Sequence, residues 1–269
     1  MIVNADDFGL SPAVTAGILE AHAAGTVSST SMMVHCPGWD DAAARARATS
    51  TLGVGLHFNL LLGTPLTAAA SLRRPTGEFL SLGALARRAL RGALRTDDIV
   101  AECEAQLAAL AGAGIRVTHI DSHRHTHALP VVHGAVARVA VAHGLPLRRP
   151  VESPLRFGGD PAGQVRGALV AWSWRLSSIG APPTHAPDHF IGMSLQGRRR
   201  FASRLAHVLG SLPCGTSELM VHPGRVDAAL AAIDGYTWPR ERERAALTDP
   251  ALVALFQRFE IALVDFSAL

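Results

Sequence analysis

Five polar side chains recur at every second position between Val117 and Ala128, namely His119, Asp121, His123, His125 and His127. In an extended strand, all five would project from one face. Neutral imidazoles and carboxylates bind divalent transition metals, and a His-x-His pair at a strand end can place two ligands on one ion. At a rise of ~3.3 Å per residue the first and last lie roughly 26 Å apart, so one ion takes one or two of them. The alternative is a histidine-rich surface strand or a solvated loop.

Two adjacent aspartates follow the first apolar run, in the segment Asn4-Ala5-Asp6-Asp7-Phe8-Gly9. Two adjacent carboxylates directly after a buried strand are costly unless a cation or a catalytic proton accompanies one of them. A helix cap is the alternative for one aspartate, but Ser11 followed by Pro12 already supplies that cap. We therefore expect Asp6 and Asp7 to take part in chemistry.

The run Gly55-Leu-His-Phe-Asn-Leu60 places His57 and Asn59 on one face and its large apolar side chains on the other. Alone, such a histidine is more often a hydrogen-bonded core residue. Together with Asp7 and one histidine of the His-rich segment, it completes an Asp/His/His set that leaves coordination positions open for water and substrate. This composition indicates a catalytic metal.

His222 ends the run Glu218-Leu-Met-Val-His222, just before a proline that turns the chain. A histidine at that end of a strand suits a general acid, although a surface histidine is the simpler alternative. Asp188, in Pro187-Asp188-His189-Phe190, is predicted to occupy a comparable place, where it could orient a histidine or bind a sugar hydroxyl.

Composition excludes several classes of protein. The 269 residues are 48% hydrophobic and carry a net charge of +3, which fits one well-buried domain and excludes disorder. The arginines are scattered apart from Arg198–Arg200, so we expect no nucleic-acid partner. No apolar segment is a clean membrane span and no signal peptide is visible, which predicts a cytoplasmic protein without a membrane partner. Cys36, Cys103 and Cys214 form no disulfide framework and no thiolate zinc motif.

Short apolar runs alternate with helical stretches along the whole chain, which predicts a single α/β domain over 1–269 with a mainly parallel sheet. Asp249 before Pro250 is expected to cap a late helix, as Ser11 does an early one, and another helix is expected from Thr96 to about Gly112 with Ile99 and Leu110 on one stripe. Seven or eight strands favour a closed or nearly closed TIM-like (β/α) barrel, in a distorted or seven-stranded form, over an open doubly wound sheet, but the count alone does not decide between them. Excursions are expected near 63–95 and 156–183. The dinucleotide and P-loop motifs are absent. In a barrel, the active site lies at the carboxyl ends of the strands. The predicted strands are Ile2–Ala5, Ser29–Val34, Val54–Leu60, Val117–Ser122, Leu147–Val151, His185–Ile191, Glu218–His222 and Ile261–Phe266.

Six short motifs, in chain order, resemble the successive signatures of the YdjC/ChbG carbohydrate deacetylase family: NADDFG, GLHFNL, THIDSHRHTH, PDHFIG, ELMVHPG and RERERAALTDP. Each is weak alone, but together they span essentially the whole chain. The resemblance implies a barrel related to polysaccharide deacetylases, one divalent metal ion, and hydrolysis of the acetamide on an N-acetylated sugar such as a chitooligosaccharide. It assigns the metal ligands to Asp7, His57 and His123. Arg124 stands where family members often have histidine, so the neighbouring pocket differs.

Amide hydrolysis needs a Lewis acid, an activated water, a base and an acid. We assign the base to Asp6 and the acid to His222, and expect zinc or magnesium as the ion. Substrate binding is assigned to Asn59, Arg124, His125, His127 and Asp188.

Two other functions stay open at this point. A metal-dependent phosphoesterase would need more ions and phosphate-binding basic residues, and a non-catalytic sugar-binding barrel would not need the paired aspartates. The expected partner is an N-acetylated saccharide, and a homodimer is left open.

Overall fold

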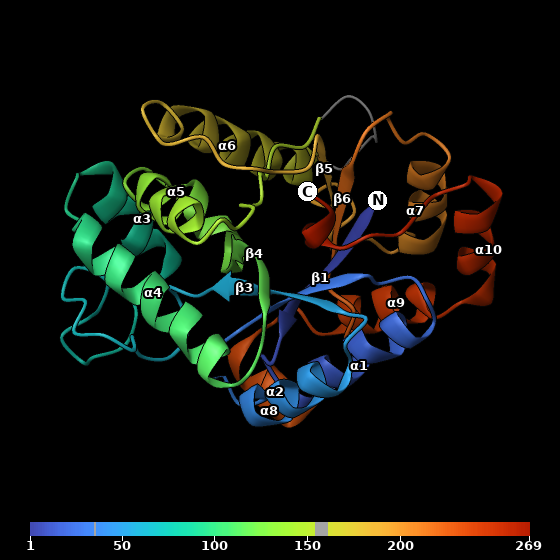
Figure 1. Cartoon of the computed structure of the whole chain (residues 1–269), viewed down its shortest axis with the longest axis horizontal. Coiled ribbons are helices and arrows are strands. Elements are labelled where there is room, and N and C mark those ends of the chain that lie inside the picture. Colours follow the sequence, from blue (N-terminus) through green and yellow to red (C-terminus); the bar gives the residue numbers. More distant parts are fainter. Residues whose placement is uncertain (35, 154–160) are drawn as a thin grey trace.

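The structure is a computed structural model that describes residues 1–34, 36–153 and 161–269. A six-stranded parallel sheet, in the order β4-β3-β2-β1-β6-β5, curls into half a barrel with helices around it (Figure 1). Parallel strands need crossover helices, which bury both faces of the sheet, and every residue of β1 is indeed buried. The strands are β1 (Ile2–Phe8), β2 (Ser29–Met32), β3 (Gly53–Phe58), β4 (Val117–Ser122), β5 (His189–Ile191) and β6 (Ser217–Val221).

The helices begin where the sequence supplies caps. Ser11 accepts a hydrogen bond from the Val14 amide at the start of α1, and Asp249 accepts one from the Ala251 amide at the start of α10, as predicted. The elements are α1 (Pro12–Ala23), α2 (Trp39–Ala48), α3 (Leu82–Leu90), α4 (Thr96–Gly112), η1 (His123–Ala128), α5 (Val132–Ala142), α6 (Pro161–Ser177), α7 (Phe201–Leu209), α8 (Ala228–Ile233), α9 (Trp238–Leu247), α10 (Pro250–Arg258) and η2 (Phe266–Ala268).

Two predicted strands do not form, so the sheet has six strands among the described residues rather than seven or eight. In the run 147–151, only Leu147 makes a bridge, to Ile120 of β4, while its amide donates to the carbonyl of His185. The run 261–266 lies beside the first residue of β1, where the Val264 amide donates to the Met1 carbonyl, and continues into η2. Isolated hydrogen bonds of this kind fix a segment in place without making a regular ladder, which leaves a distorted form of the predicted barrel.

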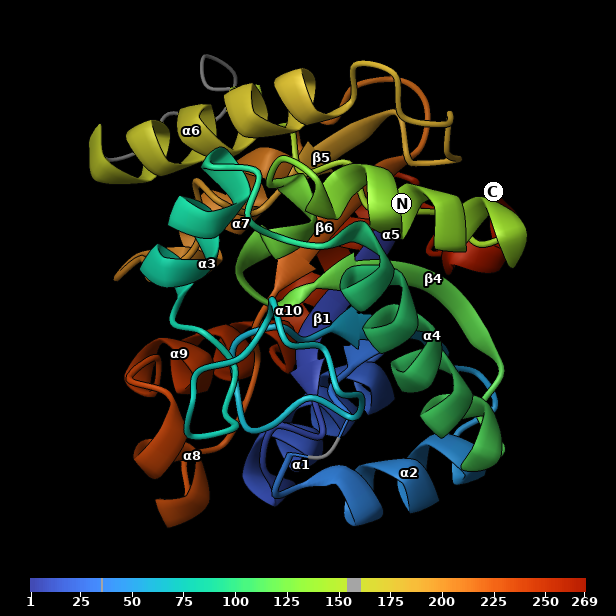
Figure 2. The ribbon, with the colours of Figure 1, turned by 90° about the vertical axis from the view of Figure 1, so that its left-hand side faces the viewer.

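Both predicted excursions contain helices. Residues 63–95 include an isolated bridge between Arg73 and Phe79, followed by α3. Residues 156–160 of the second excursion lie outside the described part, and the rest of it contains α6, which lies at the edge of the molecule in two perpendicular views (Figures 1 and 2). In the described ranges, no helix has the length and apolar character that crossing a membrane requires.

Candidate active site

The carboxyl end of β1 departs from regular strand geometry at the two aspartates. Asp7 has a positive φ of 71°, and the pairing of β1 with β2 shifts register between Ala5 and Phe8. Adjacent side chains of a regular strand point to opposite faces, whereas this irregularity lets both carboxylates reach the same buried region. A non-glycine residue in the left-handed region is strained, and such strain is concentrated at functional sites.

The three predicted metal ligands lie close together. The Asp7 Oδ1 atom is 3.2 Å from His57 Nε2 and 3.0 Å from His123 Nδ1. The ligand atoms all lie within 4.8 Å of one another, and all three residues are buried. They come from β1, β3 and the first residue of η1. One carboxylate and two imidazoles arranged in this way are compatible with a divalent ion, and binding of such an ion remains a prediction.

The other ring nitrogen of His57, Nδ1, lies within hydrogen-bonding distance of two side chains. His57 Nδ1 lies 2.7 Å from Asp121 Oδ1 and 3.0 Å from Ser31 Oγ, and the Ser31 hydroxyl donates to Asp121 Oδ2 at 2.8 Å. A carboxylate that accepts from Nδ1–H fixes the tautomer and leaves Nε2 free to act as a ligand. Asp6, His57 and Asp121 form a second group with ligand-like spacing, so variants must distinguish the two sets.

Asp6 is held by a fully buried arginine. Arg148 Nη1 and Nη2 each donate to one carboxylate oxygen of Asp6 at 2.7 Å, and Arg148 also reaches Asp121 at 2.8 Å and Glu218 at 2.6 Å. Burial alone would raise the pKa of Asp6, but the Arg148 guanidinium outweighs it and holds the pKa below its usual value. Asp6 is therefore an ionised carboxylate with a fixed orientation.

Asp7 forms an ion pair with a second arginine, Arg240, from the C-terminal third of the chain. Arg240 Nη2 donates to Asp7 Oδ2 at 2.6 Å and to Asp234 Oδ2 at 2.7 Å, while Arg240 Nε donates to the carbonyl of Tyr236. Burial would raise the pKa of Asp7, yet Arg240 and the hydrogen bonds from His123 and His57 place it well below the usual value. Its Oδ1 atom faces the two histidines.

The centre has an excess of negative charge. Asp6, Asp7 and Asp121 all have lowered pKa values, and within the described part of the chain the buried guanidinium groups that oppose them are those of Arg148 and Arg240. Burial lowers the pKa of His57, but Asp121, Asp7 and Asp6 raise it to about 10, so that a proton on this ring offsets the excess. A divalent cation would offset the same charge and displace that proton, so the charge of these residues is compatible with such an ion.

His222 follows β6 directly and lies beside Asp6. Its Nε2 atom is 3.9 Å from Asp6 Oδ2, and its ring lies 5.6 Å from that of Tyr236. Glu243 accepts a hydrogen bond from the His222 backbone amide at 2.6 Å and one from the Tyr236 hydroxyl. The predicted acid and base therefore lie next to each other.

The remaining histidines of the segment separate into different environments. His119 stacks on Phe266 at 3.7 Å, and a Cβ at Gly55 would meet its ring at 2.2 Å. His127 has Nδ1 beside Ser122 Oγ and Nε2 3.1 Å from the carbonyl of Arg148, so both nitrogens are already used within the protein. The segment does not run as one strand, because β4 ends at Ser122. His119 and His127 are thus separated from the ligand group by their packing.

Arg124 and His125 both adopt left-handed backbone angles, with φ of 52° and 54°. The His125 ring lies 5.8 Å from that of Phe190, and its buried Nδ1 has no hydrogen-bond partner among the described residues. Burial lowers the pKa of His125 to about 3, so the ring is neutral. Arg124 is about half exposed and reaches to 3.9 Å from Asp234 Oδ1.

Two predicted substrate residues are placed differently from the rest. Asp188 precedes β5, at the amino end of the sheet, and accepts from the Thr216 amide at 2.8 Å. The expectation that it lies at the same rim as His222 is wrong, because the rim is formed by the carboxyl ends. Asn59 does follow the carboxyl end of β3, but its side chain folds the next turn, accepting from the amides of Leu61 and Leu62.

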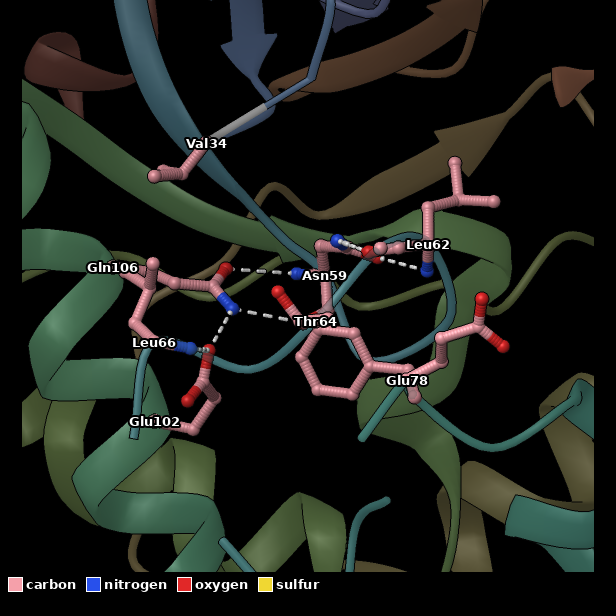
Figure 3. A pocket seen from close by; sticks show the side chains of 10 residues that line it. Val34, Asn59, Leu62, Thr64, Leu66, Glu78, Glu102 and Gln106 are labelled. Atoms are coloured by element: carbon pink, nitrogen blue, oxygen red, sulfur yellow. Dashed lines mark hydrogen bonds between the residues drawn. The ribbon is translucent and has the colours of Figure 1, made fainter. Parts of the chain in front are cut away.

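Asn59 also lines a cavity of about 200 Å³ under the excursion after β3 (Figure 3). Gln106 accepts from the Asn59 amide at 3.0 Å and donates to its carbonyl and to Glu102. Glu102 in turn accepts from the amides of Leu66 and Thr67. These bonds tie the excursion to α4 beside the site.

Sequence reasoning missed the residues that hold the others in place. Arg148 gave no signal, since it lies in an apolar run, and Arg240 was included in the last family motif without a role assigned to it. Asp121 was visible as part of the alternating pattern, but its task as the partner of His57 was not assigned. Glu218 and Ser31 were read only as strand residues.

Comparison with known proteins shows the family of this chain. A sequence model of the family described as YdjC-like protein matches residues 1–258. The chain belongs to the YdjC-like family. A carbohydrate deacetylase of Geobacillus stearothermophilus is 37% identical over 265 residues, covering 98% of this chain and 96% of that protein. A chitooligosaccharide deacetylase of Yersinia enterocolitica is 35% identical over 268 residues, covering 99% and 98%.

A solved structure also resembles this member of the family. It is the crystal structure of an Enterococcus faecalis protein described provisionally as a cellobiose-phosphate cleavage protein, with a TM-score of 0.80 and 26% identity. The alignment covers 99% of this chain and 97% of the other. The half-barrel is therefore shared along the entire length.

Proposed function

We propose that this protein is a metal-dependent hydrolase that removes the acetyl group from an N-acetylated sugar or short oligosaccharide and releases acetate. The observation that carries the proposal is that Asp6, ionised and paired with Arg148, lies close to His57 of the Asp7/His57/His123 group and 3.9 Å from His222. Full-length similarity to proteins named carbohydrate deacetylase and chitooligosaccharide deacetylase supports the same conclusion.

Asp7, His57 and His123 would hold one divalent ion, zinc or magnesium. When bound, such an ion polarises an amide carbonyl and acidifies water. Two imidazole nitrogens and one carboxylate favour zinc or another transition ion over magnesium. The Asp121 carboxylate keeps His57 oriented for this task, and Arg240 keeps Asp7 oriented.

The proton transfers are assigned to this chain's own side chains. Asp6 takes the proton of the attacking water at Oδ2, the oxygen that faces His222. Arg148 opposes protonation of Asp6 before that step and orients both of its oxygens. His222 then donates from Nε2 to the departing amine, so that a free sugar amine and acetate are released.

Arg124 and His125 are the residues that we propose contact the sugar. The neutral His125 ring carries a polar atom without a partner beside the site, and Arg124 projects from its rim. Against a phosphoesterase, the buried arginines at this centre are already paired with carboxylates and offer no free guanidinium for phosphate. We therefore favour amide hydrolysis.

The test is acetate release from a panel of N-acetylated mono- and oligosaccharides, before chelation, after it and after metal add-back. We expect release that chelation abolishes and metal restores. Asp6→Asn should keep the metal and lose turnover by about 10²–10⁴-fold. Absence of acetate from the whole panel with the metal-loaded protein, or normal release by Asp6→Asn, would overturn the proposal.

A further inference from the structure

The backbone at His222 and just beyond it contacts helix α9 closely. The His222 amide donates to Glu243 Oε2 at 2.6 Å, and the Gly224 amide donates to the Arg240 carbonyl at 3.3 Å. There is little space at this contact, because a Cβ on Gly224 would meet the Arg240 side chain at 3.3 Å. The segment that carries the proposed acid therefore rests directly on α9.

Glu243 is the side chain of α9 that bonds to the backbone of the acid itself. It is 2% exposed, and its second oxygen, Oε1, accepts from the Tyr236 hydroxyl at 2.6 Å. That hydroxyl accepts from the Gly197 amide, and the Tyr236 ring lies 5.6 Å from the His222 ring. Burying a carboxylate is costly unless its oxygens are bonded, and here both bonds lead to the immediate surroundings of His222.

The same side of α9 also reaches the proposed metal ligand Asp7. Arg240 donates to Asp7 Oδ2 at 2.6 Å, and Glu243 follows it three positions later in the helix. Residues three apart in a helix lie on the same face. One turn of α9 thus connects Asp7, in β1, with His222, which follows β6.

We propose that Glu243 is the positioning residue of His222, through which it affects protonation of the departing amine. The inference rests on the proposed function, because it needs His222 as the acid. Glu243 bonds to the backbone of His222, so it fixes where the ring stands and supplies no proton itself. An acid must lie within hydrogen-bonding reach of the atom that it protonates, and a displacement of ~1 Å can cost about 10²-fold in rate.

The experiment compares steady-state kinetics of Glu243 variants on an N-acetyl sugar and on an activated ester. Glu243→Ala should lower kcat on the sugar by about 10²-fold with KM little changed, and lose less on the ester. The double variant with His222→Ala should lose no more than His222→Ala alone, because the two residues act as a unit. Glu243→Gln should restore most of the rate, since its amide oxygen can still accept from the His222 amide.

Two further variants serve as controls. Glu241→Ala is the matched control, because Glu241 lies on the same helix and accepts from the Val226 amide at 3.1 Å, four residues beyond His222. It should keep normal turnover. Tyr236→Phe removes only the hydroxyl that donates to Glu243, and it should give a smaller loss with the same dependence on the leaving group. If circular dichroism shows that Glu243→Ala does not fold, Tyr236→Phe decides.

Exchange of the His222 amide hydrogen, followed by nuclear magnetic resonance in the metal-free protein, is a readout that needs no activity. It should be faster in Glu243→Ala than in the wild type and unchanged in Glu241→Ala. Equal losses on sugar and ester, additive losses in the double variant, or unchanged amide exchange would overturn the inference alone. A wild type that releases no acetate, with amide exchange as expected, would overturn the proposed function and this inference with it.

Discussion

Replacing Asp121 by asparagine tests whether the ligand group is held as the structure indicates. Asp121 does not belong to the proposed ligand group itself. It would affect metal binding through His57, whose Nδ1 lies 2.7 Å from Asp121 Oδ1. The amide keeps the size of the side chain and removes its charge. We expect Asp121→Asn to weaken metal binding without abolishing it.

The magnitude follows from the contacts. Losing the carboxylate behind a metal-bound histidine costs about 10–100-fold in metal affinity, which is about 1.4–2.8 kcal/mol at ~1.4 kcal/mol per tenfold. Ser31→Ala is the matched control, since Ser31 touches the same carboxylate and the same ring nitrogen but carries no charge. A neutral hydrogen bond contributes about 0.5–1.5 kcal/mol, so Ser31→Ala should weaken metal binding by roughly 2- to 10-fold.

The assay is competition for zinc with a chromophoric chelator, with circular dichroism to check the fold. Turnover of Asp121→Asn should recover in part at saturating metal. Unchanged metal affinity in Asp121→Asn, or an equal loss in Ser31→Ala, would refute the reasoning. If Asp6→Asn lost the metal and Asp7→Asn kept it, the second group, Asp6/His57/Asp121, would be the ligand set instead.

Three further outcomes are expected. His123→Ala should lose the metal and keep its fold, and full metal content by elemental analysis would remove His123 from the ligand set. His222→Ala should keep the metal and lose ~10²–10⁴-fold on an N-acetyl sugar but less on an activated ester; equal losses in steady-state rates would make His222 a positioning residue. Burial, with Asp6 and Asp121, raises the pKa of Glu218 to about 7 against the opposing Arg148. Ionising Glu218 therefore costs folding stability as pH rises from 4.5 through 7. The unfolding free energy of Glu218→Gln should exceed that of the metal-free wild type by less than about 1 kcal/mol at pH 5 and by about 3 kcal/mol at pH 8.5. An equal difference between the two proteins at both pH values, measured by urea unfolding, would contradict this.

Structural elements that depend only on residue type and local sequence pattern were predicted best. Helix α4 was expected from Thr96 to Gly112 and occupies those residues, with Ile99 and Leu110 on its buried stripe. The caps at Ser11 and Asp249 were read correctly, because a cap depends on neighbours three or fewer positions away. Strands that rely on partners far along the chain were predicted less well, as the run 147–151 shows.

The two adjacent aspartates show a second limit of prediction from the sequence. A regular strand would send Asp6 and Asp7 to opposite faces, and only the positive φ of Asp7 and the local register shift bring both into one region. Nothing in the local sequence specifies that backbone irregularity. The chemistry of both residues was therefore predictable, while their shared location was not.

Side chains that could react were identified from their chemistry, but the side chains that hold them were not, and the reason is physical. The ability of an imidazole or a carboxylate to react follows from its residue type, which the sequence gives. A residue that positions another side chain can be recognised only by the distance between the two. Arg148 lies 142 positions from Asp6, and Arg240 lies 233 positions from Asp7. Burying a guanidinium is unfavourable unless carboxylates surround it, so an arginine in an apolar run reads as a surface residue until the fold brings those carboxylates to it. The same two pairs keep Asp6 and Asp7 ionised, which makes the acidity of the centre a property of the fold rather than of any one motif.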